Sequence, residues 1–173
     1  MNFMNNKIFS GFWNFYQRHF WELSKPCEEA LRARLKPGMF TLETGSGRST
    51  YIFEAAGCRH IALEHKAKHS AALPSVVIAP LVGDPPWYDW RPSHFFDLIF
   101  IDGPATGRDA VLKVLPQCMK PSTTVIIDDT DRRADRALCE RIAREYDLVA
   151  TTHGHWDLGF IHRVFTVLEP KRP

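Results

Sequence analysis

Apolar and amphipathic stretches alternate along the chain from Pro37 onward. Apolar runs without polar alternation predict strands buried on both faces, and we expect them at 39–43, 60–64, 75–82, 95–101, 123–127, 148–151 and 160–168. Apolar positions at helical spacing predict helices at 49–56, 108–119 and 134–146, and a helix-compatible stretch follows the second strand as far as residue 72. Strands separated by helices are typical of a parallel sheet covered on both faces, so the pattern predicts an α/β fold.

The first 37 residues differ from the rest because they are rich in aromatic side chains. Five of these aromatic residues follow helical spacing and could form one apolar stripe: Phe9, Phe12, Trp13, Tyr16 and Phe20. We therefore divide the chain into an N-terminal aromatic helical segment, 1–37, and a main domain, 38–173. A helix packed against the domain is the simplest interpretation. A substrate lid, a contact in a homodimer and a membrane-surface helix are the competing interpretations.

Composition and charge narrow the class of protein. With 45% hydrophobic and 24% charged residues in 173 positions, the chain resembles an ordinary globule rather than a disordered, collagen-like or disulfide-rich chain. A net charge of +2 lacks the basic footprint of a nucleic-acid site. The four cysteines have no paired spacing, which favours reduced thiols over a zinc site or disulfides. No apolar run is long enough to span a bilayer and no secretory signal is recognised, so we expect a cytoplasmic protein.

Acidic residues stand where the predicted parallel strands end. In chain order they are Glu43, Glu64, Asp84, Asp102 and the pair Asp128-Asp129. Parallel sheets bind ligands beyond the carboxyl ends of their strands, at the point where the strand order reverses. The repetition of acidic strand ends therefore indicates a ligand site, with helix N-capping as the competing interpretation.

A glycine loop follows the first of these acidic residues. Gly45 and Gly47 allow a sharp turn and a close approach of a ligand to the amides that begin the next helix. Glu64 follows Gly45 by 19 positions, which matches the acidic residue that holds ribose hydroxyls in dinucleotide sites. Thr50 stands where a pyrophosphate site requires a third glycine. The loop therefore favours an adenosine ligand without phosphates over NAD.

With these pieces in place, the sequence resembles the class I S-adenosylmethionine (SAM)-dependent methyltransferases from residue 39 to about residue 168. The matching pieces are Leu42-Glu-Thr-Gly-Ser-Gly-Arg-Ser-Thr50, Ala62-Leu-Glu-His65, Val82-Gly-Asp84, Phe96-Asp-Leu-Ile-Phe-Ile-Asp-Gly103 and Val125-Ile-Ile-Asp-Asp129. The resemblance implies a Rossmann-like three-layer α/β/α sandwich. Its mostly parallel seven-stranded sheet would end on an antiparallel strand, which would account for the final predicted hairpin.

The resemblance also implies which residues bind the cofactor SAM. The glycine loop would cradle its methionine part, Glu64 would hold the ribose diol, Asp84 would lie near the adenine amine, and His65 would lie beside the ring. The full set of expected cofactor-binding residues is Glu43, Gly45, Ser46, Gly47, Thr50, Glu64, His65, Asp84 and Asp102.

The two later aspartate motifs are similar to those of the small-molecule O-methyltransferases. In the metal-dependent branch of that group, ligands from the ends of the fourth and fifth strands would correspond to Asp102, Asp128 and Asp129, which could hold Mg²⁺ or another divalent cation. The chain departs from this pattern in two ways. A catalytic lysine is replaced by Gly103-Pro104-Ala105 and then Arg108, and Asp-Asp replaces Asp-Asn. Without a metal, Asp102 or Asp128 could act as general base, and Arg108 could hold an acidic substrate.

We therefore predict a SAM-dependent methyltransferase that acts on an oxygen of a small-molecule acceptor. Asp84-Pro-Pro-Trp87 is similar to a motif of adenine-N6 methyltransferases, but it follows the third predicted strand instead of the fourth, which disfavours methylation of amines or nucleic acids. Two rival hypotheses stay open, namely a non-catalytic nucleotide-binding or interaction domain on the same fold and an NAD-linked enzyme.

Overall fold

A computed structural model describes residues 23–67, 73–104, 106–157 and 161–171 of the chain. The aromatic stripe predicted at residues 9–20 lies outside the described residues, and so does the end of the helix-compatible stretch, 68–72. Among the described helices, none is both long and apolar enough to cross a membrane.

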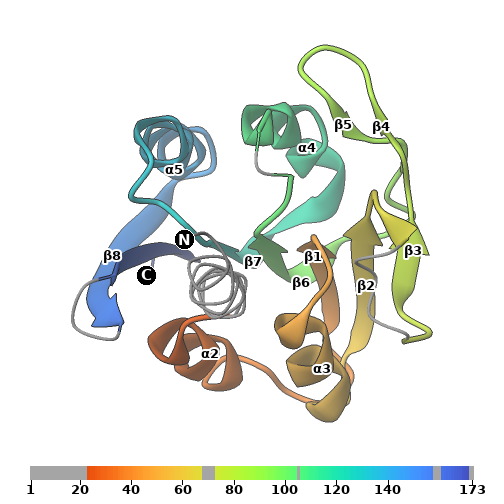
Figure 1. Cartoon of the computed structure of the whole chain (residues 1–173), viewed down its shortest axis with the longest axis horizontal. Helices are drawn as coiled ribbons and strands as arrows, with labels where there is room; N and C mark the ends of the chain where they lie inside the picture. Colours follow the sequence, from red (N-terminus) through yellow and green to blue (C-terminus); the bar gives the residue numbers. More distant parts are fainter. Residues whose placement is uncertain (1–22, 68–72, 105, 158–160, 172–173) are drawn as a thin grey trace, which may run out of the picture.

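One seven-stranded sheet forms the centre of the molecule (Figure 1). From one edge to the other its strands are β3 (Val76–Ile78), β2 (Arg59–Glu64), β1 (Phe40–Thr44), β6 (Phe96–Ile101), β7 (Met119–Ile127), β9 (Ile161–Pro170) and β8 (Leu148–Asp157). The first five strands are parallel, whereas β9 is antiparallel to both of its neighbours. This arrangement confirms the Rossmann-like fold and the antiparallel last strand.

Helices cover both faces of the sheet, as Figure 1 shows. On one side lie α2 (Lys25–Arg32) and α3 (Arg48–Ala55), and on the other lie the 3-10 helix η2 (Arg108–Lys113), α4 (Leu115–Cys118) and α5 (Arg133–Glu145). Strand β6 shows why its sequence has no polar alternation. Leu98 and Phe100 pack into the core beneath α2 and α3, whereas Ile99 and Ile101 pack into the core beneath α5, and all four are fully buried.

The order of the strands reverses between β1 and β6. After β1 the chain adds β2 and β3 on one side, and then returns to place β6 and β7 on the other. Thr44 and Ile101, the last residues of β1 and β6, are partners in the parallel register. The two carboxyl ends therefore meet at one point on the edge of the sheet, where α/β proteins of this kind bind ligands.

The predicted strand at 75–82 is wrong beyond residue 78. Strand β3 stops there, and Leu81–Val82 (β4) instead pairs with Trp87–Tyr88 (β5) in a separate antiparallel hairpin. Pro80 has no N–H to donate, so it cannot extend the parallel ladder. As a consequence Asp84 lies exposed between β4 and β5, and the expectation that it ends a parallel strand is also wrong.

The predicted helix at 108–119 is shorter and less regular than expected. A 3-10 helix covers Arg108–Lys113, one turn of α-helix follows, and β7 already begins at Met119. In addition, α2 belongs to the residues assigned to the N-terminal segment, but its buried Cys27 and Leu31 pack against Phe53 and Phe100 of the main domain. Helix α2 therefore contributes Cys27 and Leu31 to the domain core.

Candidate functional site

The glycine loop after β1 lies directly against the end of β6. Gly45 has a φ of +88°, and a Cβ atom added there would lie 3.3 Å from the Gly103 nitrogen. The Gly103 N–H donates to the Thr44 carbonyl oxygen at 2.7 Å, which holds the two strand ends together. The absence of side chains at the two glycines therefore lets the glycine loop pack directly on the backbone that follows β6.

Glu43 faces the interior of the protein. Its side chain is 1% exposed, and its carboxylate accepts hydrogen bonds from the Ser49 hydroxyl and, at 2.7 Å, from the Thr50 hydroxyl. His60 Nε2 lies 3.2 Å from the same carboxylate. Glu43 thus fixes the start of α3 on β1 and shapes the glycine loop from below, and these protein groups engage both of its carboxylate oxygens.

Thr50 completes the same arrangement. It is fully buried, and its hydroxyl oxygen accepts the Gly47 N–H at 2.9 Å while the hydroxyl donates to Glu43. A third glycine at this position would remove both hydrogen bonds. The departure from the dinucleotide-binding pattern is thus explained by the contacts of one hydroxyl group.

Glu64 is at the end of β2 and its carboxylate faces the glycine loop. One oxygen accepts the N–H groups of His65 at 2.7 Å and Lys66 at 2.9 Å, and the other lies 3.3 Å from the Ser46 nitrogen. His65 Nδ1 lies 3.2 Å from the same carboxylate. The expected ribose acceptor therefore lies beside the loop, as the spacing of 19 residues predicts.

Tyr88 belongs to this site, although the sequence did not single it out. It is 3% exposed, and its hydroxyl oxygen lies 2.8 Å from the position of a Cβ atom added at Gly103. Among the described residues the hydroxyl has no hydrogen-bond partner. Burial raises the pKa of Tyr88, and the nearby charge on Glu64 raises it further. The hydroxyl is thus a neutral donor at the reversal point.

A buried hydroxyl without a partner costs about 1–3 kcal/mol, so it calls for an explanation. A polar ligand bound over the glycine loop would supply the missing acceptor. This orphaned donor and the Glu64 carboxylate beside the glycine loop together fit a nucleoside-containing ligand such as SAM. In the sequence, Tyr88 directly follows the Asp84-Pro-Pro-Trp87 motif. Because that motif was interpreted only as a possible methyltransferase motif, Tyr88 was not considered.

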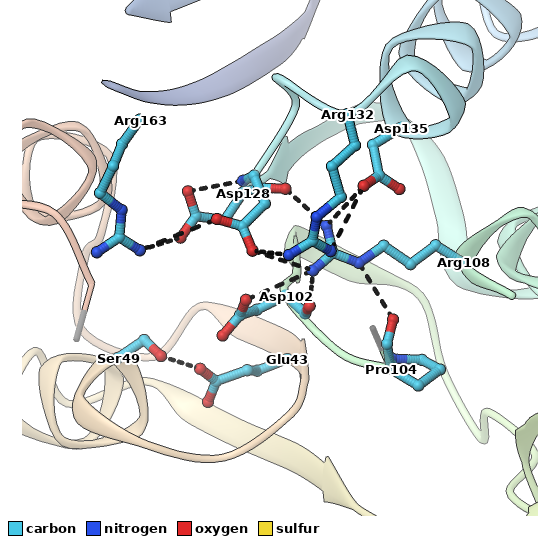
Figure 2. A network of polar contacts seen from close by, with 10 residues as sticks. Glu43, Ser49, Asp102, Pro104, Arg108, Asp128, Arg132, Asp135 and Arg163 are labelled. Atoms are coloured by element: carbon cyan, nitrogen blue, oxygen red, sulfur yellow. Dashed lines mark hydrogen bonds and ion pairs between the residues drawn. The ribbon is translucent and has the colours of Figure 1, made fainter. Parts of the chain in front are cut away.

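A second polar cluster lies at the ends of β6 and β7 (Figure 2). Asp102 follows β6, and Asp128 and Asp129 follow β7, so the three predicted carboxylates do come together. Asp135 joins them from the first turn of α5. Three arginines from separate elements pair with these aspartates: Arg108, Arg132 and Arg163.

Arg108 is the most enclosed of the three arginines, with 4% of its surface exposed. Its guanidinium donates to the carbonyl oxygens of Asp128 at 2.7 Å and Pro104 at 3.2 Å, and also to that of Asp102. Its nitrogens lie 3.4 Å from an Asp135 carboxylate oxygen and 3.8 Å from one of Asp129. These protein groups engage all three guanidinium nitrogens, and burial leaves little surface with which to hold an acceptor.

The carboxylates expected to bind a metal do not fit one in this arrangement. Arg108 Nη2 lies 3.7 Å from Asp102 Oδ1 and 3.8 Å from Asp129 Oδ2, so a guanidinium stands where a shared cation would lie. Arg163 approaches Asp128 from the other side at 3.8 Å. Across the part of the chain that the structure describes, no group of three or more His, Cys, Asp or Glu residues is placed to hold a metal ion.

Asp102 differs from the other carboxylates of the cluster in its accessibility. Its side chain is 47% exposed, compared with 4% for Asp128. The protein surrounds the Asp102 carboxyl closely enough that burial raises its pKa, and the charge on Asp128 raises it further. Burial likewise raises the pKa of Asp128, with a further contribution from Asp129. Of the two expected bases, Asp102 is the one that an acceptor can reach.

The structure thus places most of the expected cofactor residues around the reversal point. Ser46 and His65 both contact Glu64 there, and Asp102 lies next to Gly103 on the same strand end. Asp84 is instead exposed in the β4–β5 hairpin, while Glu43 and Thr50 support the loop from within.

Comparisons with known proteins support the fold. No family model matches the sequence, and no curated protein matches it either. Among solved structures, an O-methyltransferase from Bacillus cereus in complex with SAH is 20% identical over 87% of this chain and 83% of that chain, with a TM-score of 0.66.

Two further solved structures cover the same share of this chain, with TM-scores close to that value. The precorrin-6Y C5,15-methyltransferase from Geobacter metallireducens is 13% identical over 87% of this chain and 90% of that chain, with a TM-score of 0.63. The O-methyltransferase TomG from Streptomyces achromogenes, in complex with SAM, is 17% identical over 87% of this chain and 82% of that chain, with a TM-score of 0.62. The chain therefore has the Rossmann-like fold of the SAM-dependent methyltransferases.

Proposed function

We propose that this protein binds SAM and transfers its methyl group to an oxygen of a small-molecule acceptor. The observation that carries the proposal is the reversal point itself, where Gly45 lies against Gly103 and the Glu64 carboxylate faces the loop. The similar solved structures include two O-methyltransferases, in complex with SAH and with SAM. Their activity favours an oxygen acceptor over a nitrogen acceptor.

The residues at the reversal point would hold SAM through complementary groups. Glu64 would accept hydrogen bonds from ribose hydroxyls in place of the long contact of 3.3 Å that it makes with Ser46. The bare backbone of Gly45 and Gly103 would allow the methionine part to lie close to the strand ends. Tyr88 would donate its unpaired hydroxyl to the ligand. When bound, SAM would supply an electrophilic methyl group, to which the acceptor oxygen would bond as the methyl–sulfur bond breaks and SAH leaves.

Asp102 would act as the general base of the reaction. Its carboxylate is the accessible one of the cluster, and Arg108 fixes its backbone through the carbonyl oxygen. A carboxyl group with a raised pKa is a stronger base than an ordinary aspartate, so it would accept the proton of an acceptor hydroxyl more readily. Alignment of the acceptor oxygen with the methyl group would supply much of the remaining rate enhancement.

Binding of SAH, the demethylated product, tests the first half of the proposal. A ligand at about 100 times its Kd stabilises a protein by roughly 2.7 kcal/mol, so SAH should raise the melting temperature and NAD should not. Glu64→Ala should abolish the SAH effect, whereas Glu140→Ala, an exposed change on α5, should preserve it. Stabilisation by NAD alone would favour an NAD-linked enzyme.

Methyl transfer itself separates an enzyme from a non-catalytic binding domain on the same fold. The absence of the expected lysine and the engagement of Arg108 by protein groups are the observations that favour the binding domain. Incubation with methyl-labelled SAM and a small-molecule extract should yield labelled products detected by mass spectrometry. Binding of SAH without any labelled product would support the non-catalytic domain.

A further inference from the structure

The carboxylates at the ends of β6 and β7 are paired with arginines from within the chain. Figure 2 shows Arg108 and Arg163 approaching from opposite sides, with Asp128 between them. Arg108 lies 3.7 Å from Asp102 and 3.8 Å from Asp129, and Arg163 lies 3.8 Å from Asp128 and 4.0 Å from Asp129. Each of the three aspartates that the sequence suggested as metal ligands therefore faces a guanidinium group.

A third arginine and a fourth carboxylate extend this pairing. Arg132 adds a third guanidinium at 2.7 Å from Asp129 and 3.8 Å from the fourth carboxylate, Asp135. Four carboxylates thus face three permanent positive charges. A divalent cation bound by the same oxygens at about 2.0–2.6 Å would have to displace at least one of these guanidinium groups.

Displacing Arg108 would be especially unfavourable. The Arg108 side chain is 3% exposed, and its withdrawal would leave the carbonyl oxygens of Asp102, Pro104 and Asp128 without their donor. Arginine stays protonated under all ordinary conditions, so its charge cannot be removed by a change of pH. Arg108 is therefore a fixed part of the site, and its side chain does not move away to admit a metal.

We propose that Arg108 and Arg163 occupy the place of a divalent cation, so that this site works without a metal. Arg108 acts as a positioning residue. Its guanidinium donates to the carbonyl oxygen of Asp102 after β6 and to that of Asp128 after β7, and so fixes the backbone of Asp102 relative to β7. The consequence for catalysis rests on the proposed methyl transfer. The absence of metal binding does not rest on the proposed methyl transfer, because it follows from the arrangement of the aspartates and arginines alone.

Direct measurement of Mn²⁺ binding tests this proposal independently of any activity. Free Mn²⁺ is followed by electron paramagnetic resonance during titration of the whole chain. The variants are Arg163→Gln and Arg108→Gln, and the control is Arg144→Gln on the exposed surface of α5. Circular dichroism establishes which variants fold. Arg163 lies at the edge of the cluster, so Arg163→Gln decides the outcome if Arg108→Gln does not fold.

We expect no detectable Mn²⁺ binding by the wild type or Arg144→Gln, and we expect Arg163→Gln to bind Mn²⁺ at least about tenfold more tightly than the detection limit, which corresponds to 1.4 kcal/mol. The gain should disappear when Asp128→Asn is added to Arg163→Gln. Wild-type binding of one Mn²⁺ that Asp102→Asn removes would overturn the proposal. An absence of binding in every variant would also overturn it, because the aspartates would then not form a cation site even when an arginine is removed.

The methyl-transfer assay adds a separate readout. If the proposed function holds, product formation by the wild type should be equal in excess chelator and in excess Mg²⁺. Activity that the chelator abolishes and Mg²⁺ restores would contradict a metal-free site. Failure to bind SAH would contradict the proposed function and leave the Mn²⁺ result unaffected, so the two failures can be told apart.

Discussion

The hydroxyl oxygen of Tyr88 lies directly over the α-carbon of Gly103, at 2.8 Å from the position that a Cβ atom would occupy. This contact joins the β4–β5 hairpin to the end of β6. Gly103 also lies against Gly45, whose α-carbon would be 3.2 Å from the same Cβ atom. Residue 103 is therefore enclosed by the hairpin on one side and by the glycine loop on the other.

Gly103→Ala should destabilise the protein by about 1–3 kcal/mol, the usual cost of overpacking, and should weaken SAH binding. Thermal denaturation measures the first effect and calorimetric titration the second. Gly47→Ala is the matched control for stability, because a Cβ atom there meets nothing within 4 Å and the backbone is extended. Adding Tyr88→Phe to Gly103→Ala should recover part of the loss. No recovery would show that the clash with Gly45 dominates.

Tyr88→Phe alone should weaken SAH binding by about fivefold, because the ligand would lose a hydrogen bond worth about 1 kcal/mol. In the absence of SAH the same change should leave the melting temperature equal or higher, since it removes a buried hydroxyl that has no partner among the described residues. Tyr51→Phe, whose side chain is 54% exposed, is the control. Unchanged SAH affinity in Tyr88→Phe would exclude a ligand contact by this hydroxyl.

Thr50→Val should lower the free energy of unfolding by about 1–3 kcal/mol, because the shape is retained while two buried hydrogen bonds are lost. The Gly47 N–H would lose its acceptor and the Glu43 carboxylate one of its donors. Urea denaturation gives the change in stability. Thr151→Val, on the exposed side of β8, should change it little. A neutral effect at Thr50 would contradict the role assigned to its hydroxyl.

Asp128→Asn should stabilise the protein at about pH 8 and have little effect near pH 4. The folded-state pKa of Asp128 is raised above the ordinary value of about 3.9, so the folded state binds more protons than the unfolded state between those two pKa values. The stability of the wild type therefore falls as the pH rises through that window. Asparagine does not ionise, so the variant does not lose this stability. Melting temperatures across the pH range test the prediction, with exposed Asp89→Asn as control. A wild type and variant with parallel pH profiles would contradict it.

Asp102→Asn should lower kcat for methyl transfer by about 10²- to 10⁴-fold, the usual contribution of a general base. The KM for SAM should change much less, because asparagine keeps the shape of the side chain. Asp109→Asn, an exposed change on η2, should leave both constants unchanged. A loss confined to KM would assign Asp102 to binding instead of proton transfer.

The sequence predicted the sheet well where one physical signal dominated. The continuous apolar run of β6 required burial on both faces, and Glu64 could be placed beside the glycine loop from its spacing alone. The end of the third predicted strand was wrong because apolar residues continue through Pro80, while the ladder cannot. A pattern of apolar residues reports burial and does not reveal where hydrogen bonding stops.

The candidate site was harder to predict because its members meet only in three dimensions. Arg108 and Arg163 are 55 residues apart in the sequence, and nothing in either segment indicates that both face Asp128 and Asp129. Tyr88 reaches the site through a hairpin that the sequence did not predict. The charge of the aspartate motifs was visible in the sequence, but the groups that balance it were not.

Strand β9 runs opposite to the parallel strands, so its beginning, not its end, reaches the aspartates. Arg163 pairs with His155 across the β8–β9 hairpin, and the Thr130 N–H donates to the Val164 carbonyl oxygen at 2.8 Å. A slip of one residue in this hairpin would turn Arg163 to the opposite face of the sheet. Insertions or deletions between β8 and β9 are therefore tolerable only if they preserve this pairing. The register of the hairpin thus helps to determine whether the aspartates at the ends of β6 and β7 attract a metal.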